Sequence, residues 1–149
     1  MPKLDLESIE ATNRTGYPPP YAEVMRRRWY RRLAPAAGLD DFGISQVRLE
    51  PGGISSQRHW HDGEDEVVIM LAGEAVLIEE EGETVMRAGD IAAFPKGVPN
   101  GHHLVNRGDC DCLFVAVGKP AASDCHYPDI DVHLDNESGN FVHKDGRAY

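Results

Sequence analysis

The sequence predicts an all-β fold of short strands, preceded by an N-terminal arm with a short helix and followed by an extended polar tail. Three observations support this class. Short apolar segments recur between residues 43 and 118, turn residues separate them, and the 149-residue chain contains 15 glycines and 10 prolines. Short strands separated by turns rich in glycine and proline are typical of a β-sandwich or β-barrel.

Residues 1–42 are predicted to form the arm and the helix. The arm ends in Tyr17-Pro18-Pro19-Pro20, a run that is incompatible with a helix or a central strand. The segment Tyr21–Ala37 is predicted to be helical, because four apolar residues recur at helix-like spacing. These residues are Val24, Met25, Trp29 and Leu33.

The segment Arg26–Arg32 is strongly basic in a chain with a net charge of −10. Its five arginines are Arg26, Arg27, Arg28, Arg31 and Arg32. One interpretation is a solvated face that docks on the acidic body of the chain or on a partner subunit, and the other is a patch for an anion or a membrane surface. The overall negative charge disfavours nucleic acid as a partner.

Residues 43–118 are predicted to form the barrel core. Strands are expected at Ile44–Glu50, Gln57–His61, Glu66–Leu71, Ala75–Glu79, Thr84–Arg87, Ile91–Phe94, His102–Asn106 and Leu113–Val117. Residues 119–149 are expected to form a tail that packs on the barrel or on a partner subunit.

Side chains around the second of these strands suit a divalent transition metal. His59 and His61 are two residues apart, so in a strand they point to one face, with Trp60 on the other. Glu66 can return to meet them, and two imidazoles with one carboxylate leave open coordination positions. Gln57 shares the parity of the histidines and is a candidate substrate contact unless a bulge intervenes. The alternative is a pair of surface histidines on an edge strand.

A second dense motif runs from Gly89 to Asn106 and ends in a histidine pair. Adjacent residues of a strand point to opposite faces, so only one of His102 and His103 can point inward. If that face carries the metal, the ligands become three histidines and one glutamate. Asn106 is expected to hydrogen-bond the backbone of a turn.

Residues 53–73 resemble the first motif of the cupin superfamily, and residues 89–106 resemble the second. The first motif is filled at Gly53, His59, His61, Glu66 and Gly73, and the second at Gly89, Pro95, Gly97 and Asn106. One position departs, because the family spacing places a histidine where this chain has Asn100. His102 stands four residues before Asn106, as the pattern requires. The resemblance therefore assigns the fourth ligand to His102, with His103 as the alternative.

This resemblance implies a single jelly-roll β-barrel, a homodimer, and one divalent transition metal per chain (Fe, Mn, Zn or Ni). It also implies a metal-dependent enzyme of the dioxygenase, decarboxylase, isomerase or lyase type, acting on a small polar, oxygen-rich molecule. The alternative is a non-catalytic protein that binds or senses a small organic acid or sugar. A sugar-modifying cupin would need a pocket rich in aromatic and basic residues, and the sequence offers few obvious ones. No catalytic acid or base beyond the ligands is evident.

The sequence predicts a cytoplasmic protein without a membrane partner. No apolar segment approaches the roughly 18 residues that span a bilayer, and the N-terminus has no apolar signal core. The three cysteines, Cys110, Cys112 and Cys125, are a poor disulfide framework. Metal binding by Cys110 and Cys112 is a weak alternative, because a lone pair at this spacing is not specific.

Overall fold

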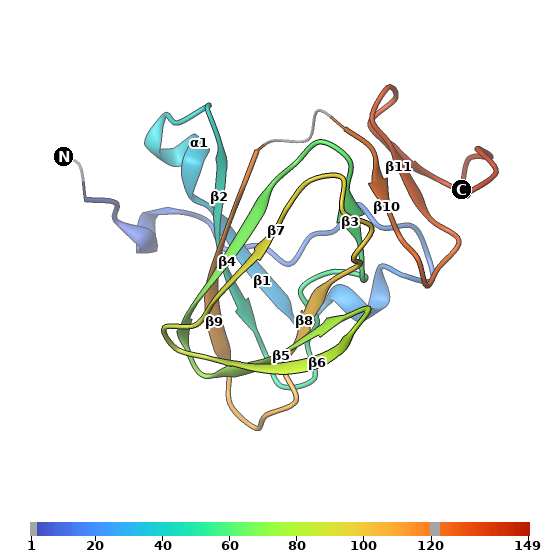
Figure 1. Cartoon of the computed structure of the whole chain (residues 1–149). Coiled ribbons are helices and arrows are strands. Elements are labelled where there is room, and N and C mark those ends of the chain that lie inside the picture. Colours follow the sequence, from blue (N-terminus) through green and yellow to red (C-terminus); the bar gives the residue numbers. More distant parts are fainter. Residues whose placement is uncertain (1–2, 120–122) are drawn as a thin grey trace.

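Alternating side chains in two long strands build the centre of the fold. In the computed structural model, which describes residues 3–119 and 123–149, β2 (Gly43–Leu49) pairs antiparallel with β9 (Cys112–Gly118) (Figure 1). Val47 and Leu49 of β2 and Phe114 of β9 point inward and are buried. Residues between them along each strand are more exposed, as the two-residue period of a strand requires.

Two sheets enclose the main hydrophobic core. One has the strand order β1-β2-β9-β4-β7, with β1 at Arg28–Arg32, β4 at Glu66–Ala72 and β7 at Ile91–Phe94. The other has the order β6-β5-β8, with β5 at Glu74–Glu79, β6 at Gly82–Arg87 and β8 at His103–Val105. Val68 and Phe114 of the first sheet share one core cluster with Leu77 and Leu104 of the second. The predicted jelly-roll class is confirmed, as a sandwich in which the ladders of the described residues do not close into one continuous barrel.

A strand overlaps each of the eight predicted ranges, with differences of one or two residues at most ends. The largest difference is at β3, which covers only Trp60–His61. His59 precedes it and instead forms an isolated antiparallel bridge with His102. This bridge joins the two sequence motifs directly through their backbones.

The predicted helix over Tyr21–Ala37 is wrong. The segment forms a 3-10 turn (η2, Glu23–Met25), then strand β1, and only then a short helix (α1, Leu33–Ala37). β1 pairs with β2 along its whole length, from Arg28 opposite Leu49 to Arg32 opposite Ser45. The aromatic residues Trp29 and Tyr30 favour a strand, and the ladder with β2 outweighs the helix-like spacing of the apolar residues.

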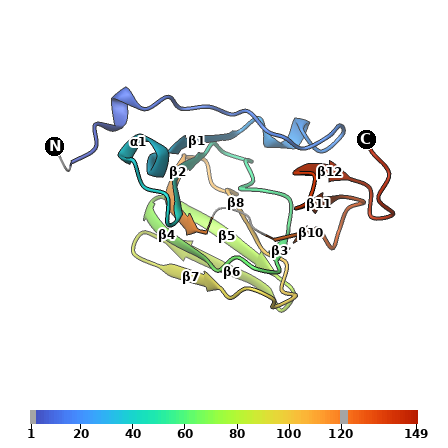
Figure 2. The ribbon, with the colours of Figure 1, turned by 90° about the horizontal axis from the view of Figure 1, so that it is seen from above.

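The arm and the tail both join the body of the protein. The arm contains a short 3-10 turn (η1, Leu6–Ser8) and bridges to β1 through Thr12 and Tyr30. The tail forms β10 (Cys125–His126), β11 (His133–Asp135) and β12 (Asn140–Val142), in a sheet of order β12-β11-β10-β3. Figure 2 shows the arm running along β1 and the tail strands beside β3.

A second core cluster ties the arm to the tail. It consists of Tyr17, Met25, Cys125, Tyr127 and Val132. The tail therefore contributes buried residues and a strand partner for β3. None of the helices in the described part of the chain has the length and apolar composition that a membrane crossing requires.

Candidate functional site

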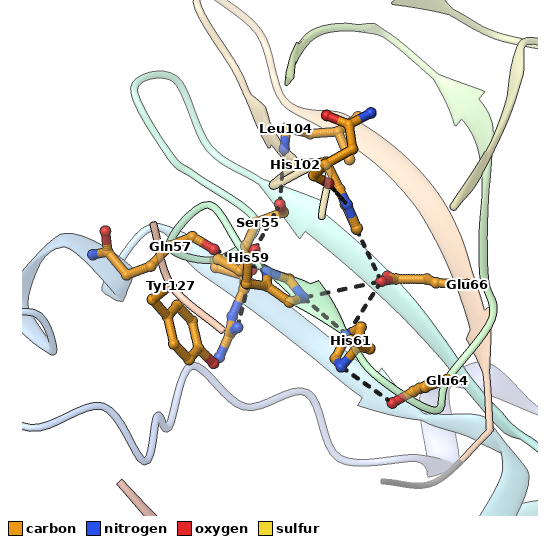
Figure 3. Close-up of polar contacts among 12 residues, drawn as sticks. Ser55, Gln57, His59, His61, Glu64, Glu66, His102, Leu104 and Tyr127 are labelled. Carbon is orange, nitrogen blue, oxygen red and sulfur yellow. Dashed lines mark hydrogen bonds and ion pairs between the residues drawn. The ribbon is translucent and has the colours of Figure 1, made fainter. Parts of the chain in front are cut away.

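The four side chains predicted as metal ligands come together at one point (Figure 3). Nε2 of His59 lies 3.1 Å from Nε2 of His61. One carboxylate oxygen of Glu66, Oε2, lies 3.3 Å from Nε2 of His102, 3.7 Å from Nε2 of His61 and 4.0 Å from Nε2 of His59. We call this group the His/Glu cluster. The donor atoms of His59, Glu66 and His102 all lie within 4.8 Å of one another, as the ligands of one metal ion would, and His61 contacts His59 and Glu66 beside them.

Backbone pairing places these side chains. The amide of His102 donates to the carbonyl of His59 at 2.9 Å, and the amide of His59 donates to the carbonyl of His102 at 3.2 Å. His61 lies in β3 and Glu66 begins β4. Trp60 stacks on His126 with ring centroids 4.2 Å apart, which agrees with the prediction that it faces away from the cluster.

Backbone carbonyls fix the tautomers of two of the histidines. Nδ1 of His59 lies 2.9 Å from the carbonyl oxygen of Gln57, and Nδ1 of His102 lies 3.1 Å from that of Asn100. A carbonyl can only accept, so each Nδ1 carries the hydrogen and each Nε2 presents a lone pair to the cluster. Lone pairs that face a carboxylate need a cation between them, either a metal ion or a further proton. The donors therefore fit a divalent metal in an arrangement that is common for metal-binding histidines.

The pKa values of the cluster show where such a proton would reside. Burial lowers the pKa of His59 to about 4. Burial also acts to lower the pKa of His61, but hydrogen bonding to Cys125 and Glu66 outweighs it and raises that pKa to about 10. For Glu66, burial acts to raise the pKa, but the close imidazoles of His102 and His61 hold it well below its usual range. Both shifts favour an ion pair between Glu66 and His61 when no metal is bound.

The structure brings His102, and not His103, to Glu66. His102 is 4% exposed and stacks on Phe94 with ring centroids 3.5 Å apart. Nδ1 of His103 donates instead to the carbonyl of Ser56 at 2.9 Å. The side chain of Asn100, which occupies the family's histidine position, accepts from the amide of Glu80 and so anchors the loop.

Two further sequence predictions can be compared with the structure. Asn106 donates to the carbonyls of Leu49 and Cys110 and accepts from the amide of Gly108, which confirms that it binds turn backbone. Gln57 meets the cluster through its carbonyl, while its side-chain amide points away from Glu66 (Figure 3). A substrate contact by Gln57 stays a prediction.

Other residues at the site were not identified from the sequence. Glu64, expected only in a turn, places Oε2 3.6 Å from Nδ1 of His61. Burial raises the pKa of Glu64, although His61 opposes the rise. Cys125 comes from the tail, and a ligand atom of each of His59, His61 and Cys125 lies within 4.8 Å of the others. Nothing in the local sequence marks Cys125, because its position depends on the pairing of β10 with β3.

A cavity of about 350 Å³ adjoins the cluster, which is within the usual size of small-molecule sites. His59, Glu66 and His102 contribute to its lining, together with Arg28, Tyr30 and Arg32 of β1 and Tyr17 of the arm. The expectation that the pocket has few aromatic and basic residues is therefore wrong. It failed because alternate residues of β1 share a face only once the segment is a strand.

The two cavity arginines have no carboxylate partner among the described residues, although the chain is rich in acids. Arg28 donates to the carbonyls of Ser55 at 3.0 Å and Arg14 at 3.4 Å, and its Nε is buried without a hydrogen-bond partner. Arg31, between them in β1, turns to the other side and donates to the carbonyl of Ile9 at 3.0 Å. The cavity thus combines a metal-type cluster with positive charge that has no internal counter-ion.

Comparison with known proteins agrees with this geometry. The cupin domain profile matches residues 45–118. A sugar phosphate isomerase of the cupin superfamily from Silicibacter pomeroyi is 44% identical, with 99% of this chain and 96% of that chain covered and a TM-score of 0.94. A predicted oxalate decarboxylase from Thermotoga maritima is 26% identical, with 63% of this chain and 81% of that chain covered and a TM-score of 0.54.

A curated relative extends the comparison. The oxalate-binding protein of Thermotoga maritima is 33% identical over 74 residues, which are 50% of this chain and 59% of the relative. The match thus spans less than two thirds of that protein. The likeness to the Silicibacter structure, in contrast, includes the arm and the tail as well as the core. The motifs, the jelly-roll fold and this full-length likeness together show that the chain belongs to the cupin superfamily.

Proposed function

We propose that the protein is a metal-dependent isomerase that acts on a small phosphorylated sugar. The observation that carries the proposal is the placement of Arg28 and Arg32 in the cavity that His59, Glu66 and His102 also line. A phosphorylated sugar offers an anionic group at one end and hydroxyl and carbonyl oxygens at the other. The 44% identity to a cupin sugar phosphate isomerase supports the same substrate class.

The roles of the residues follow from their chemistry. A divalent metal (Fe, Mn, Zn or Ni) held by His59, His61, Glu66 and His102 would supply Lewis-acid polarisation of a substrate oxygen. The guanidinium groups of Arg28 and Arg32 would bind the phosphate, because their planar donors match its oxygens. Arg28 is already oriented by the carbonyl of Ser55 and stacks over the ring of Tyr30, with 5.0 Å from Cζ to the ring centroid.

Aldose–ketose isomerisation also needs a group that moves a proton between neighbouring carbons. His103 lines the cavity, and its Nδ1 hydrogen is committed to the carbonyl of Ser56. Its Nε2 has no protein partner among the described residues, so it is available to accept a proton. We assign this role to His103 on that placement.

The test is an isomerisation assay of metal-loaded protein, followed by nuclear magnetic resonance. Pentose and hexose phosphates are compared with the same sugars without phosphate, and only the phosphorylated forms are expected to be converted. Arg32→Met should lower kcat/KM about 10- to 100-fold, since a hydrogen bond to a charged group contributes about 1.5–3 kcal/mol. Arg31→Met is the matched control, because Arg31 belongs to the same strand but faces away from the cavity.

A second candidate function is non-catalytic binding of a small dicarboxylate. The likeness to an oxalate-binding protein favours it, and unpaired arginines suit a carboxylate as well as a phosphate. Calorimetry with oxalate separates the two. Tight binding of unchanged oxalate, with no conversion of any sugar phosphate, would replace the isomerase by this function.

The proton-transfer role of His103 in the isomerase has its own test. His103→Gln should lower kcat more than it raises KM, and a change confined to KM contradicts the assignment of His103 as the proton-transferring group.

We also propose the homodimer that the resemblance implies. Ile91, Leu71 and Val85 are large apolar residues that lie exposed on strands β7, β4 and β6. Sedimentation equilibrium measures the mass in solution, and a monomer at micromolar concentration contradicts this proposal.

A further inference from the structure

The C-terminal tail brings a thiol to the His/Glu cluster. Cys125 of β10 is 1% exposed and lies directly opposite His61 of β3 in the antiparallel ladder. Side chains of directly opposed residues point to the same face of a sheet. His59, two residues before His61, points to that face as well, and ligand atoms of all three residues lie within 4.8 Å of one another.

The site therefore contains two overlapping sets of donors. His59, Glu66 and His102 form a set of nitrogen and oxygen donors. His59 and His61 form with Cys125 a set of nitrogen and sulfur donors. Imidazole and carboxylate suit ions such as Mn²⁺ and Fe²⁺, whereas thiolate selects softer ions such as Zn²⁺. Both sets use His59, so two ions cannot occupy them at once.

His61 is the cluster histidine that backbone hydrogen bonds leave free. Nδ1 of His59 and Nδ1 of His102 donate to carbonyls, which fixes both rings. Nδ1 of His61 is buried and makes no hydrogen bond among the described residues, its polar contact being the Glu64 carboxylate at 3.6 Å. The ring of His61 can therefore adjust toward either set of donors without breaking a hydrogen bond of this nitrogen.

A purely structural role for Cys125 does not account for this placement. Cys125 does belong to the second core cluster, where a small apolar side chain would pack as well. Cys112 is equally buried in the main core, but it is absent from every group of potential metal ligands among the described residues. Cys110 is exposed and is likewise absent from these groups. Of the three cysteines, Cys125 is the one with two imidazoles in reach.

We propose that Cys125, His59 and His61 form a soft-metal site that overlaps the His/Glu cluster. Thiophilic ions such as Zn²⁺ and Cd²⁺ bind there through the sulfur and exclude the harder ion from the cluster. The thiol proton passes to solvent as the metal–sulfur bond forms, and no electron is transferred. The choice between a hard and a thiophilic ion is thus determined by the two donor sets of the site, in addition to its proposed catalytic role.

Cobalt spectroscopy tests the sulfur donor directly. Metal-free protein is titrated with Co²⁺, and a thiolate-to-cobalt charge-transfer band is expected in the near ultraviolet. Cys125→Ser should abolish the band, while Cys110→Ser, the matched exposed control, and Glu66→Gln should keep it. A wild-type protein without the band, or a Cys125→Ser protein with it, overturns the proposal. Because Cys125→Ser could fail to fold, the ¹¹³Cd chemical shift of the wild-type complex provides a second measurement. A shift typical of nitrogen and oxygen ligands alone also overturns the proposal.

Relative affinities separate ligation from packing. Cys125→Ser should weaken Cd²⁺ binding at least about tenfold, since loss of even an outer-shell partner costs about 10- to 100-fold. Mn²⁺ binding, followed by electron paramagnetic resonance, should stay nearly unchanged. An equal loss for both ions means that Cys125 only packs and refutes the proposal. No substrate enters these measurements, so their failure is distinct from a failure of the isomerase assay.

Discussion

Asn106 provides a quantitative test of how the two motifs are held together. Its side chain is fully buried and makes three hydrogen bonds to backbone groups: 2.8 Å to the carbonyl of Leu49 at the end of β2, 2.8 Å to that of Cys110 and 2.9 Å from the amide of Gly108. Its own backbone pairs with Gly52 and Gly53 at the start of the first motif. Asn106→Ala removes all three side-chain bonds and keeps the backbone pairing.

The expected loss follows from these bonds. Each net hydrogen bond contributes on the order of 1 kcal/mol, so Asn106→Ala should lower the free energy of unfolding by about 3 kcal/mol. For a chain of this size, about 2–4 °C in Tm per kcal/mol gives a decrease of about 6–12 °C. Differential scanning calorimetry measures it.

Two further variants sharpen the result. Asn106→Asp at neutral pH should be at least as unstable as Asn106→Ala, because a carboxylate would face the two carbonyl oxygens that the amide now serves. Asn100→Ala is the control, since the bonds of Asn100 lie in a more exposed loop. An Asn106→Ala protein that melts with the wild type refutes the reasoning.

Two other predictions concern protons. Mn²⁺ binding at neutral pH should release about one proton. Without metal, burial acts to lower the pKa of His61, but hydrogen bonding to Cys125 and Glu66 raises it to about 10. A nitrogen that binds the metal must lose its proton. Calorimetry in buffers of different ionisation enthalpy measures this release, and a buffer-independent enthalpy contradicts it. Arg58 donates two hydrogen bonds to Asp129, at 2.7 and 2.8 Å, which lowers the pKa of Asp129 below its ordinary value. The Arg58–Asp129 pair stabilises the fold fully above the pKa that Asp129 has in the unfolded chain. The stabilisation is lost as the pH falls through the lower pKa of Asp129 in the folded protein. The Tm difference between wild type and Arg58→Ala should therefore shrink on acidification. A difference that is constant with pH contradicts this reasoning.

For His59, His61 and Glu66 the information in the sequence is local, whereas His102 was assigned through the resemblance to the cupin motif. His59 and His61 share a strand face, and Glu66 follows at a fixed distance. His102 was found by counting back from Asn106, and the structure shows why that works. The bridge between His59 and His102 and the pairing of Asn106 with Gly53 belong to the same run of backbone contacts.

The cavity wall could not be predicted in the same way. The segment Tyr21–Ala37 carries apolar residues at a spacing that fits a helix, but the conformation of Arg28–Arg32 within it is decided by pairing with β2, more than ten residues later. Once β1 is a strand, Arg28 and Arg32 point to the cavity and Arg31 points away. Cys125 depends on an even longer range contact, the pairing of β10 with β3. Propensity and motif spacing contain no information about such pairings.

The pairing of β3 with β10 also has a consequence for the order of events during synthesis. Chains fold as they leave the ribosome, N-terminal parts first, so His59, His61, Glu66 and His102 emerge well before Cys125. A nascent chain that ends at Gly118 holds every member of the His/Glu cluster, while β3 still has an open edge that invites pairing with other chains. A harder ion captured at that stage would meet no competing sulfur. The metal first loaded can therefore depend on how far translation has proceeded, and only the finished chain offers both choices.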